Sequence, residues 1–477
     1  MPIEPTRRGA ALAVLCAMAL MIVLDGTIVA VAVPSIQRDL GFSPAGVAWV
    51  VNAYLVAFAG LLLLAGRLGD LIGAWRVFLA GLAVFTLASL LCGLARSAEL
   101  LVVGRFVQGA GGALASAVIL GTIVRIYPEP AGQARAMGIY SFTQAAGATL
   151  GLVVGGILTD AAGWPWIFLI NVPIGAVVFV AGRRLLPREA VQGLRGGVDL
   201  SGAVLVTAGL SVGVYAIVGT GPNLALGAGA LLLIAGFLAR QRWARNPLIP
   251  LRLLGRPWLL ATNAAVVLIF AAGLGFQFVS ALYVQRIMGL NPLQTGLAFL
   301  PTPVMIAIVS LLAAPRLTGR FGPRPVLLAG LLGLAGGLLL LSRAPVTASY
   351  LIDILPALVT MGLAVGVTIP AIIMLSMAGA EPCDTGMVSG FNNTAQQAGA
   401  ALGLAVLAAV AAAQTSSRTA AGVPATTALH DGYSLAFLVA GGFVIGALLI
   451  TALLLRRPPT ASAPEPQPAV ENATPVT

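Results

Sequence analysis

The sequence predicts an all-α, polytopic membrane protein, and its composition is the first reason. Of its 477 residues, 59% are hydrophobic and only 9% are charged, and the mean hydropathy is +1.01. Soluble domains carry about 25% charged residues, so this chain is too apolar for a soluble globule. The second reason is a series of apolar runs of roughly 17 to 28 residues, the length that a helix needs to cross a bilayer.

The apolar runs predict fourteen transmembrane helices. They cover residues 10–33, 46–66, 77–95, 99–124, 136–159, 167–186, 200–219, 224–239, 258–282, 294–314, 325–342, 349–377, 386–413 and 433–455. The seventh and eighth helices are short and lie close together in the chain, which predicts a helical hairpin. The end of the chain, 458–477, is rich in Pro, Ala and Thr, a composition typical of a disordered tail.

All 26 basic residues are arginines, and their placement predicts the topology. If both ends of the chain are cytoplasmic, twenty arginines lie on the inner side and five on the outer side, with Arg105 inside a span. Such a bias follows the positive-inside rule. It explains the net charge of +11 without nucleic acid as a partner. The absence of lysine, with abundant Ala, Gly and Arg, suggests a bacterial plasma membrane protein.

A repeated stretch predicts two similar halves. Residues 138–151 match residues 390–403 at seven of fourteen positions without a gap, which indicates a duplicated unit. Both copies lie on helices that run from inside to outside, as a parallel repeat of six plus six helices requires. The predicted domains are therefore 1–190 and 258–457, joined by a linker, 191–257, that carries the two inserted helices.

The residue inventory argues against metal and enzyme chemistry. Three scattered cysteines and a single histidine, His430, provide neither a metal-ligand cluster nor a Cys/His catalytic arrangement. The chain has no lysine to complete an ATP-binding P-loop. We expect no cofactor, and a proton gradient as the energy source.

Five motifs carry a family resemblance. They are LDGTIV from Leu24, GRLGDLIG from Gly66, RxxQGxGGA from Arg105, GxxxGLxxGG from Gly147 and WIFLINVPIG from Trp166. In this order and at these places, they resemble the major facilitator superfamily and are similar to its fourteen-helix drug:proton antiporter branch. The resemblance implies the major facilitator fold, with two six-helix halves and two inserted helices. The sequence departs from the usual motifs at Leu152, where proline is common, and at Ala74 and Trp75, where basic residues are common.

Three ionisable residues lie within or at the edge of predicted spans and are candidates for proton coupling or cation binding: Asp25, Arg105 and Asp353. A charge at mid-bilayer costs about 2.5–3.5 kcal/mol on insertion scales, so such residues tend to be paired or functional. The rise per helical residue places Asp25 and Arg105 at similar depths, where they could meet across a cavity. The alternatives are a buried structural cluster for Asp25, a hydrogen bond between helices for Arg105, and an interfacial position for Asp353.

Two further motifs predict moving parts. The resemblance implies that Gly66, Asp70, Gly73 and Arg76 form a gating loop that closes the cytoplasmic side, although Asp70 could also be an ordinary loop acid in a tight turn. Gly147, Gly151 and Gly155 recur every four residues, which predicts a face for close helix contact, and Gly156 completes the antiporter motif.

Uncharged polar side chains predict the lining of a substrate cavity. These residues are Asn52, Tyr54, Gln108, Gln144, Asn392, Asn393, Gln396 and Gln397. The last four form one helical stripe that would be costly against lipid, so we expect it to face the interior. The stripe could contact substrate or could hold helices together.

The predicted function is proton-coupled export of small amphipathic organic compounds or drugs by alternating access, as expected for a multidrug efflux protein. The alternatives are a dedicated exporter of one secondary metabolite and a proton-coupled importer. We expect a monomer in a lipid bilayer, with protons and a small organic molecule as its partners. A membrane enzyme would need a cluster of catalytic residues, which this sequence lacks. A receptor that does not transport would be expected to carry a long soluble sensing domain.

Overall fold

The structure is a computed structural model, and it describes residues 5–43, 46–188, 199–218, 223–244, 247–248, 255–378 and 385–455. Within these ranges the chain forms helices and their connections, with no strand. The predicted disordered tail, Cys383 and part of the predicted linker lie outside the described residues.

The helices fall into three consecutive groups. The first comprises α1 (Pro5–Leu40), η1 (Gly46–Ala48), α2 (Trp49–Ile72), α3 (Ala74–Gly93), α4 (Ala98–Ile126), α5 (Pro130–Ala162), α6 (Pro165–Leu169) and α7 (Asn171–Leu185). The inserted pair is α8 (Leu200–Val218) and α9 (Leu224–Trp243). The last group comprises α11 (Pro257–Arg286), α12 (Pro292–Phe299), α13 (Pro301–Ile308), η3 (Val309–Ala313), α14 (Ala314–Phe321), α15 (Pro323–Ser342), η4 (Tyr350–Ile354), α16 (Leu355–Met377), α17 (Thr385–Ala420) and α18 (Ala425–Leu454).

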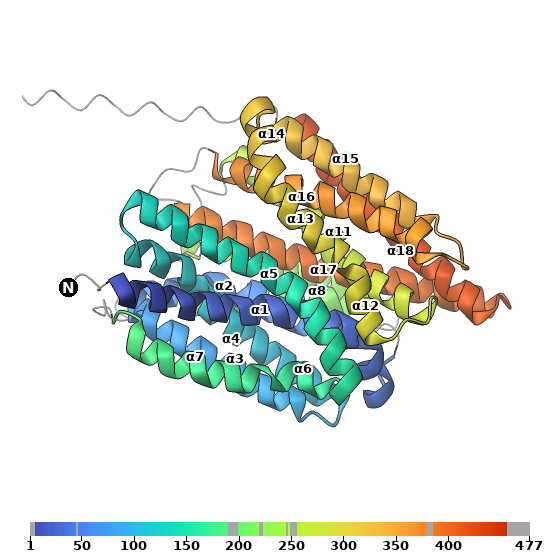
Figure 1. Ribbon diagram of the computed structural model, residues 1–477, viewed down its shortest axis with the longest axis horizontal. Helices are drawn as coiled ribbons and strands as arrows, with labels where there is room; N and C mark the ends of the chain where they lie inside the picture. The colour runs from blue at the N-terminus through green and yellow to red at the C-terminus, as the bar shows by residue number, and fades with distance from the viewer. Residues whose placement is uncertain are drawn as a thin grey trace, which may run out of the picture.

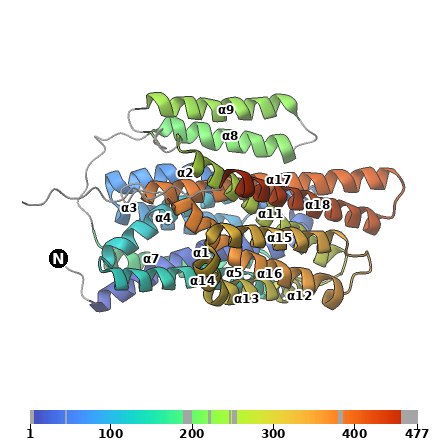
Figure 2. The same ribbon diagram turned by 90° about the horizontal axis from the view of Figure 1, so that it is seen from above.

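The first and last groups form two bundles that lie side by side. Figure 1 shows α1 to α7 on one side of the molecule and α11 to α18 on the other, with α5, α11 and α17 along the junction. The inserted pair forms a separate layer (Figure 2). Within it, α9 packs on α8, and α8 packs on both α2 and α17. The inserted pair therefore contacts one helix from each bundle.

The helices have the length and hydropathy of membrane spans. Thirteen described segments meet these criteria, and they coincide with thirteen of the fourteen predicted spans. The other predicted span, 136–159, lies in α5, a continuous helix of 33 residues that packs along α1. Within α5, Leu150–Ala162 forms a shorter apolar segment. The predicted all-α, multi-pass membrane fold is confirmed.

Glycines allow corresponding helices of the two bundles to pack closely. A Cβ atom on Gly147 would lie 3.1 Å from Leu20 of α1, and one on Gly155 would lie 2.6 Å from Ile28 of α1. In the second bundle, a Cβ atom on Gly399 or Gly403 of α17 would overlap the α11 backbone. The two copies of the repeated stretch therefore have the same structural role, because each packs closely against the first helix of its own bundle.

Candidate functional site

A buried ion pair joins the first and fourth spans. Asp25 of α1 and Arg105 of α4 are both fully buried, and Arg105 Nη1 lies 2.5 Å from Asp25 Oδ2. The structure therefore brings together two of the three charged residues that the sequence singles out. Removing one partner of such a pair leaves an uncompensated buried charge, which costs about 3–5 kcal/mol.

Amide side chains complete the hydrogen bonds of Asp25. Gln108, one turn along α4, accepts a hydrogen bond from Arg105 Nη1 at 2.7 Å. Its Nε2 donates to Asp25 Oδ1 at 2.8 Å and to Ser89 Oγ of α3 at 2.7 Å. Asn171 Nδ2, at the start of α7, donates to Asp25 Oδ1 at 3.3 Å. Three different side chains therefore donate to the carboxylate, which satisfies its acceptor oxygens.

The other side of the Arg105 guanidinium contacts backbone and aromatic rings. Arg105 Nε donates to the Val50 carbonyl at 2.8 Å. Its Cζ lies 4.4 Å from the centre of the Tyr54 ring and 5.6 Å from that of Phe168. Aromatic faces attract cations, so these rings stabilise a guanidinium that water does not reach.

Several buried polar atoms near this pair have no hydrogen-bond partner among the described residues. They are Arg105 Nη2, the Tyr54 hydroxyl, Asn171 Oδ1 and both side-chain polar atoms of Asn52. Buried polar groups are nearly always paired with protein or with water. These atoms are donors and acceptors that a rearrangement of the network could pair.

The network lies inside the first bundle, and not across a cavity as the sequence analysis expects. Its side chains come from α1, α2, α3, α4, α6 and α7. The helical rise gives the depth of Asp25 and Arg105 but does not give the direction in which they point. Gln108 and Tyr54, expected in the cavity lining, belong to this buried network instead.

The polar stripe on α17 is divided between two roles. Asn392 donates to Ser376 Oγ of α16 at 2.9 Å, and Gln396 donates to Asn392 Oδ1 at 2.6 Å. Asn392 therefore connects α17 to α16, and Gln396 supports Asn392 from the next turn of α17. Asn393 and Gln397, which follow them in the sequence, are partly exposed and make no side-chain hydrogen bond with another described residue. They are the members of the stripe that remain available to a ligand.

Two other predicted residues make local contacts. Asp353 is partly exposed, and its Oδ2 accepts a hydrogen bond from the Ser349 N–H at 2.7 Å, so the carboxylate caps the start of its own helix. Gln144 Nε2 donates to the Tyr140 hydroxyl at 3.1 Å, one turn earlier on α5. Asp353 therefore does not join Asp25 and Arg105, and its interfacial interpretation fits the structure better.

The two bundles touch at the end where α1 and α11 finish. Gln285 Nε2 of α11 donates to the Val31 carbonyl of α1 at 2.9 Å. The next residue, Arg286, donates to the Gln37 side chain. A Cβ atom on Gly156 of α5 would lie 2.7 Å from the Pro292 carbonyl of α12. These contacts close the interface between the bundles at this end.

Comparison with known proteins identifies the family. The sequence profile described as Major Facilitator Superfamily matches residues 15–404. The chain belongs to the major facilitator superfamily. Among curated relatives, the puromycin resistance protein pur8 of Streptomyces alboniger is 37% identical over 463 residues, covering 94% of this chain and 90% of the relative. The cephamycin export protein CmcT of Amycolatopsis lactamdurans is 36% identical over 476 residues, covering 98% and 95% of the two chains.

A solved structure supports the same fold. A bacterial homologue of the human lysosomal transporter Spinster, in an inward-facing and occupied conformation, superimposes with a TM-score of 0.69. It is 15% identical in sequence, and the match covers 95% of this chain and 98% of the other.

The loop signature of this superfamily is unpaired in the structure. Asp70 and Arg76 are exposed and make no ion pair with one another or with any other described residue. Gly73 separates α2 from α3 with φ of 92°, a conformation that only glycine adopts easily. At Gly66, one turn before Asp70, an added Cβ atom would have nothing within 4 Å. The predicted gating role of this loop stays a prediction.

Sequence reasoning missed two members of the buried network, Asn171, which bonds to Asp25, and Ser89, which bonds to Gln108. Asn171 lies within a quoted motif but receives no role from it, and Ser89 is one polar residue in an apolar span. The available signal is that a polar side chain in a membrane helix usually bonds to another helix. That rule predicts that a partner exists without naming it.

Proposed function

We propose that this member of the major facilitator superfamily is a proton-coupled exporter of drugs or secondary metabolites. The relatives named for puromycin resistance and for cephamycin export support the substrate class and the direction. Coupling to protons rests on the buried pair of Asp25 and Arg105. That pair is the single observation that carries the proposal, because a carboxylate in a protein interior is a group that a proton can neutralise.

Protonation of Asp25 would break the ion pair from one side. The neutral acid no longer balances the Arg105 charge, and Gln108 and Asn171 must then rearrange, because a protonated carboxyl group accepts fewer hydrogen bonds. The unpartnered Tyr54 hydroxyl and Asn171 Oδ1 offer the Arg105 guanidinium alternative hydrogen-bond acceptors. Proton binding would thus loosen α1 from α4.

The same turn of α1 that carries Asp25 also contacts α5. Leu24 and Thr27 lie against Gly151, and Ile28 lies against Gly155. Two turns of α5 therefore pack directly against this part of α1. Gly156, on the same helix α5, contacts α12 of the other bundle. A shift of α1 would reach the seam between the bundles through this short chain of contacts. Alternating access requires such a link between proton site and gate.

The energy of the proton gradient is sufficient for export. A potential of about 150 mV supplies roughly 3.5 kcal/mol per charge moved, which corresponds to about a 300-fold concentration ratio. Efflux by cells should therefore stop when a protonophore collapses the gradient while ATP is intact.

The decisive measurement uses purified protein in liposomes that contain a pH indicator. Wild-type protein should exchange protons for an amphipathic antibiotic, and Asp25→Asn should not, because an amide has the size of the acid but cannot take up a proton. Asp353→Asn is the matched control, since it changes the same group at a partly exposed helix cap. Full proton exchange by Asp25→Asn with loss in Asp353→Asn would move the coupling site to the second bundle.

Two related functions make different predictions in the same assay. A dedicated exporter of one metabolite would show proton exchange with one compound in a panel. An importer would accumulate substrate in cells that express the protein. The names of the relatives favour export, and the panel decides how broad it is.

A further inference from the structure

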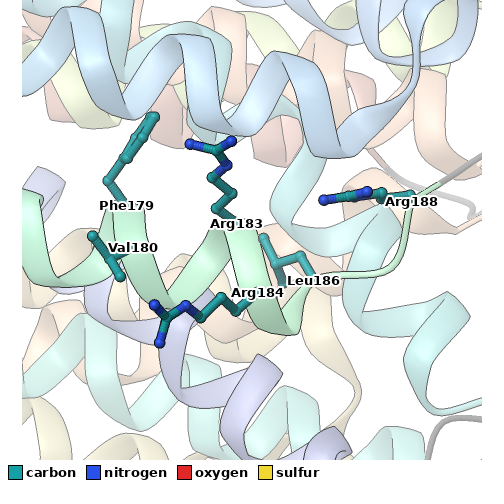
Figure 3. Close-up of a pocket in the computed structure, with 6 residues that line it drawn as sticks. All are labelled: Phe179, Val180, Arg183, Arg184, Leu186 and Arg188. Carbon is teal, nitrogen blue, oxygen red and sulfur yellow. The ribbon is translucent and has the colours of Figure 1, made fainter.

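A pocket of about 700 Å³ lies at the end of α7, lined by Phe179, Val180, Arg183, Arg184, Leu186 and Arg188 (Figure 3). It is separate from the Asp25 network. Asn171 is twelve residues before Arg183 on the same helix, which is about 18 Å at 1.5 Å per residue. The pocket therefore belongs to the end of a membrane span, where lipid headgroups lie.

The pocket is strongly cationic, and none of the described residues that line it is acidic. Arg183, Arg184 and Arg188 are all exposed, and none pairs with a carboxylate among the described residues. In Figure 3, Arg183 and Arg184 extend to opposite sides of α7, and Arg188 points back toward the helix from the segment that follows it. Three arginines that line one pocket attract an anion, and their planar guanidinium forks suit phosphate oxygens.

The position of Arg188 is fixed by an aromatic contact. Its Cζ lies 5.0 Å from the centre of the Trp75 ring. This contact leaves the N–H groups of the guanidinium free, because a ring face attracts the cation without accepting a full set of hydrogen bonds. Trp75 is thus a support that holds one cation at the pocket.

The walls of the pocket toward the membrane are apolar. Val180 is 51% exposed, and Val177, one turn earlier on α7, is 70% exposed. An apolar strip that leads along a membrane helix to a cluster of arginines matches a molecule with a phosphate at one end and an acyl chain at the other. A free phosphate ion would use only the arginines.

We propose that this pocket binds the headgroup of an anionic phospholipid, with the phosphate on the arginine side chains that line the pocket and an acyl chain along Val177 and Val180. Basic residues at the cytoplasmic end of a transmembrane helix attract such headgroups. The arginine bias of the sequence assigns this end of α7 to that side.

Native mass spectrometry of the full-length protein in detergent tests the proposal. Protein would be titrated with phosphatidylglycerol and, separately, with phosphatidylcholine. The variant Arg183→Gln/Arg184→Gln/Arg188→Gln should bind the first phosphatidylglycerol at least tenfold more weakly than wild type, since each arginine near a lipid headgroup contributes about fivefold. Binding of phosphatidylcholine should change by less than twofold.

A matched variant separates the pocket from general charge. Arg242→Gln/Arg316→Gln/Arg320→Gln removes three exposed arginines from other helix ends and should bind phosphatidylglycerol as wild type does. Equal weakening in both variants would overturn the proposal, because net charge alone would then explain binding. Unchanged binding by the pocket variant would overturn it as well. A third refuting result is complete displacement of bound phosphatidylglycerol by millimolar inorganic phosphate, because the site would then be one for free anions.

Discussion

Adding one methyl group at Gly151 tests whether the contact between α1 and α5 must be as close as the structure shows. A Cβ atom there would overlap Thr27 Oγ1 and lie 3.0 Å from the Leu24 carbonyl. The carbonyl belongs to backbone and cannot rotate away. Overpacking of this kind costs about 1–3 kcal/mol, whereas alanine in place of glycine in an open helix contributes about 1 kcal/mol of stability.

The control is Gly441→Ala on α18, where nothing lies within 4 Å of the added atom. We expect Gly441→Ala to be neutral or stabilising and Gly151→Ala to lower the free energy of unfolding in detergent by up to about 2 kcal/mol, after its propensity gain is subtracted. The double variant Thr27→Ala/Gly151→Ala should recover part of the loss. Removing Oγ1 leaves Leu24 as the closest contact, so the two sites should be coupled by about 1 kcal/mol.

Transport by Gly151→Leu gives the functional result. Expression and insertion should remain near wild type, while exchange in liposomes should be lost, because a leucine side chain separates the turn of α1 that carries Asp25 from α5. Wild-type stability and transport in Gly151→Leu, with normal insertion, would refute the close-contact reasoning.

Three further outcomes follow from other contacts. Arg105→Lys should lose most proton-coupled transport in the liposome assay, because one ammonium group cannot reproduce the fork that bonds to Asp25 and to backbone, and a wild-type rate would argue against a specific role for the fork. Gln37→Ala should weaken the contact between the bundles where α1 and α11 end, because it removes the acceptor of Arg286. Spin-label distances between these two helix ends should therefore increase, and unchanged distances would show that other contacts hold this end. Burial raises the pKa of Asp199, but hydrogen bonds from Gly202, Ser201, Arg240 and Gln241 outweigh this effect, so the pKa lies below its ordinary value. The stability that Asp199 contributes to the packing of α8 and α9 is therefore present above about pH 4 and is lost as the pH falls through the lowered pKa. A plot of the free energy of unfolding against pH should drop at acid pH in the wild type and drop less in Asp199→Asn.

The sequence alone determines the fold class and the depth of the important residues. Burial in lipid is a one-dimensional property, so apolar runs and arginine placement predict the spans, and thirteen of them coincide with described helices. The glycine spacing likewise predicts a close-contact face, because small residues at a period of four lie on one side of a helix. Asp25 and Arg105 stand out for the same reason, since charges in apolar runs are costly.

Tertiary structure alone decides which way these residues face. A helix that is apolar on all sides carries no stripe that distinguishes lipid from protein. The sequence therefore could not show that Asp25 points into the first bundle toward Asn171, or that Asp353 caps its own helix. The place of α8 between α2 and α17 also depends on contacts between helices distant in the chain. Spacing along a chain specifies neighbours within a helix, whereas partners across helices are specified only by packing.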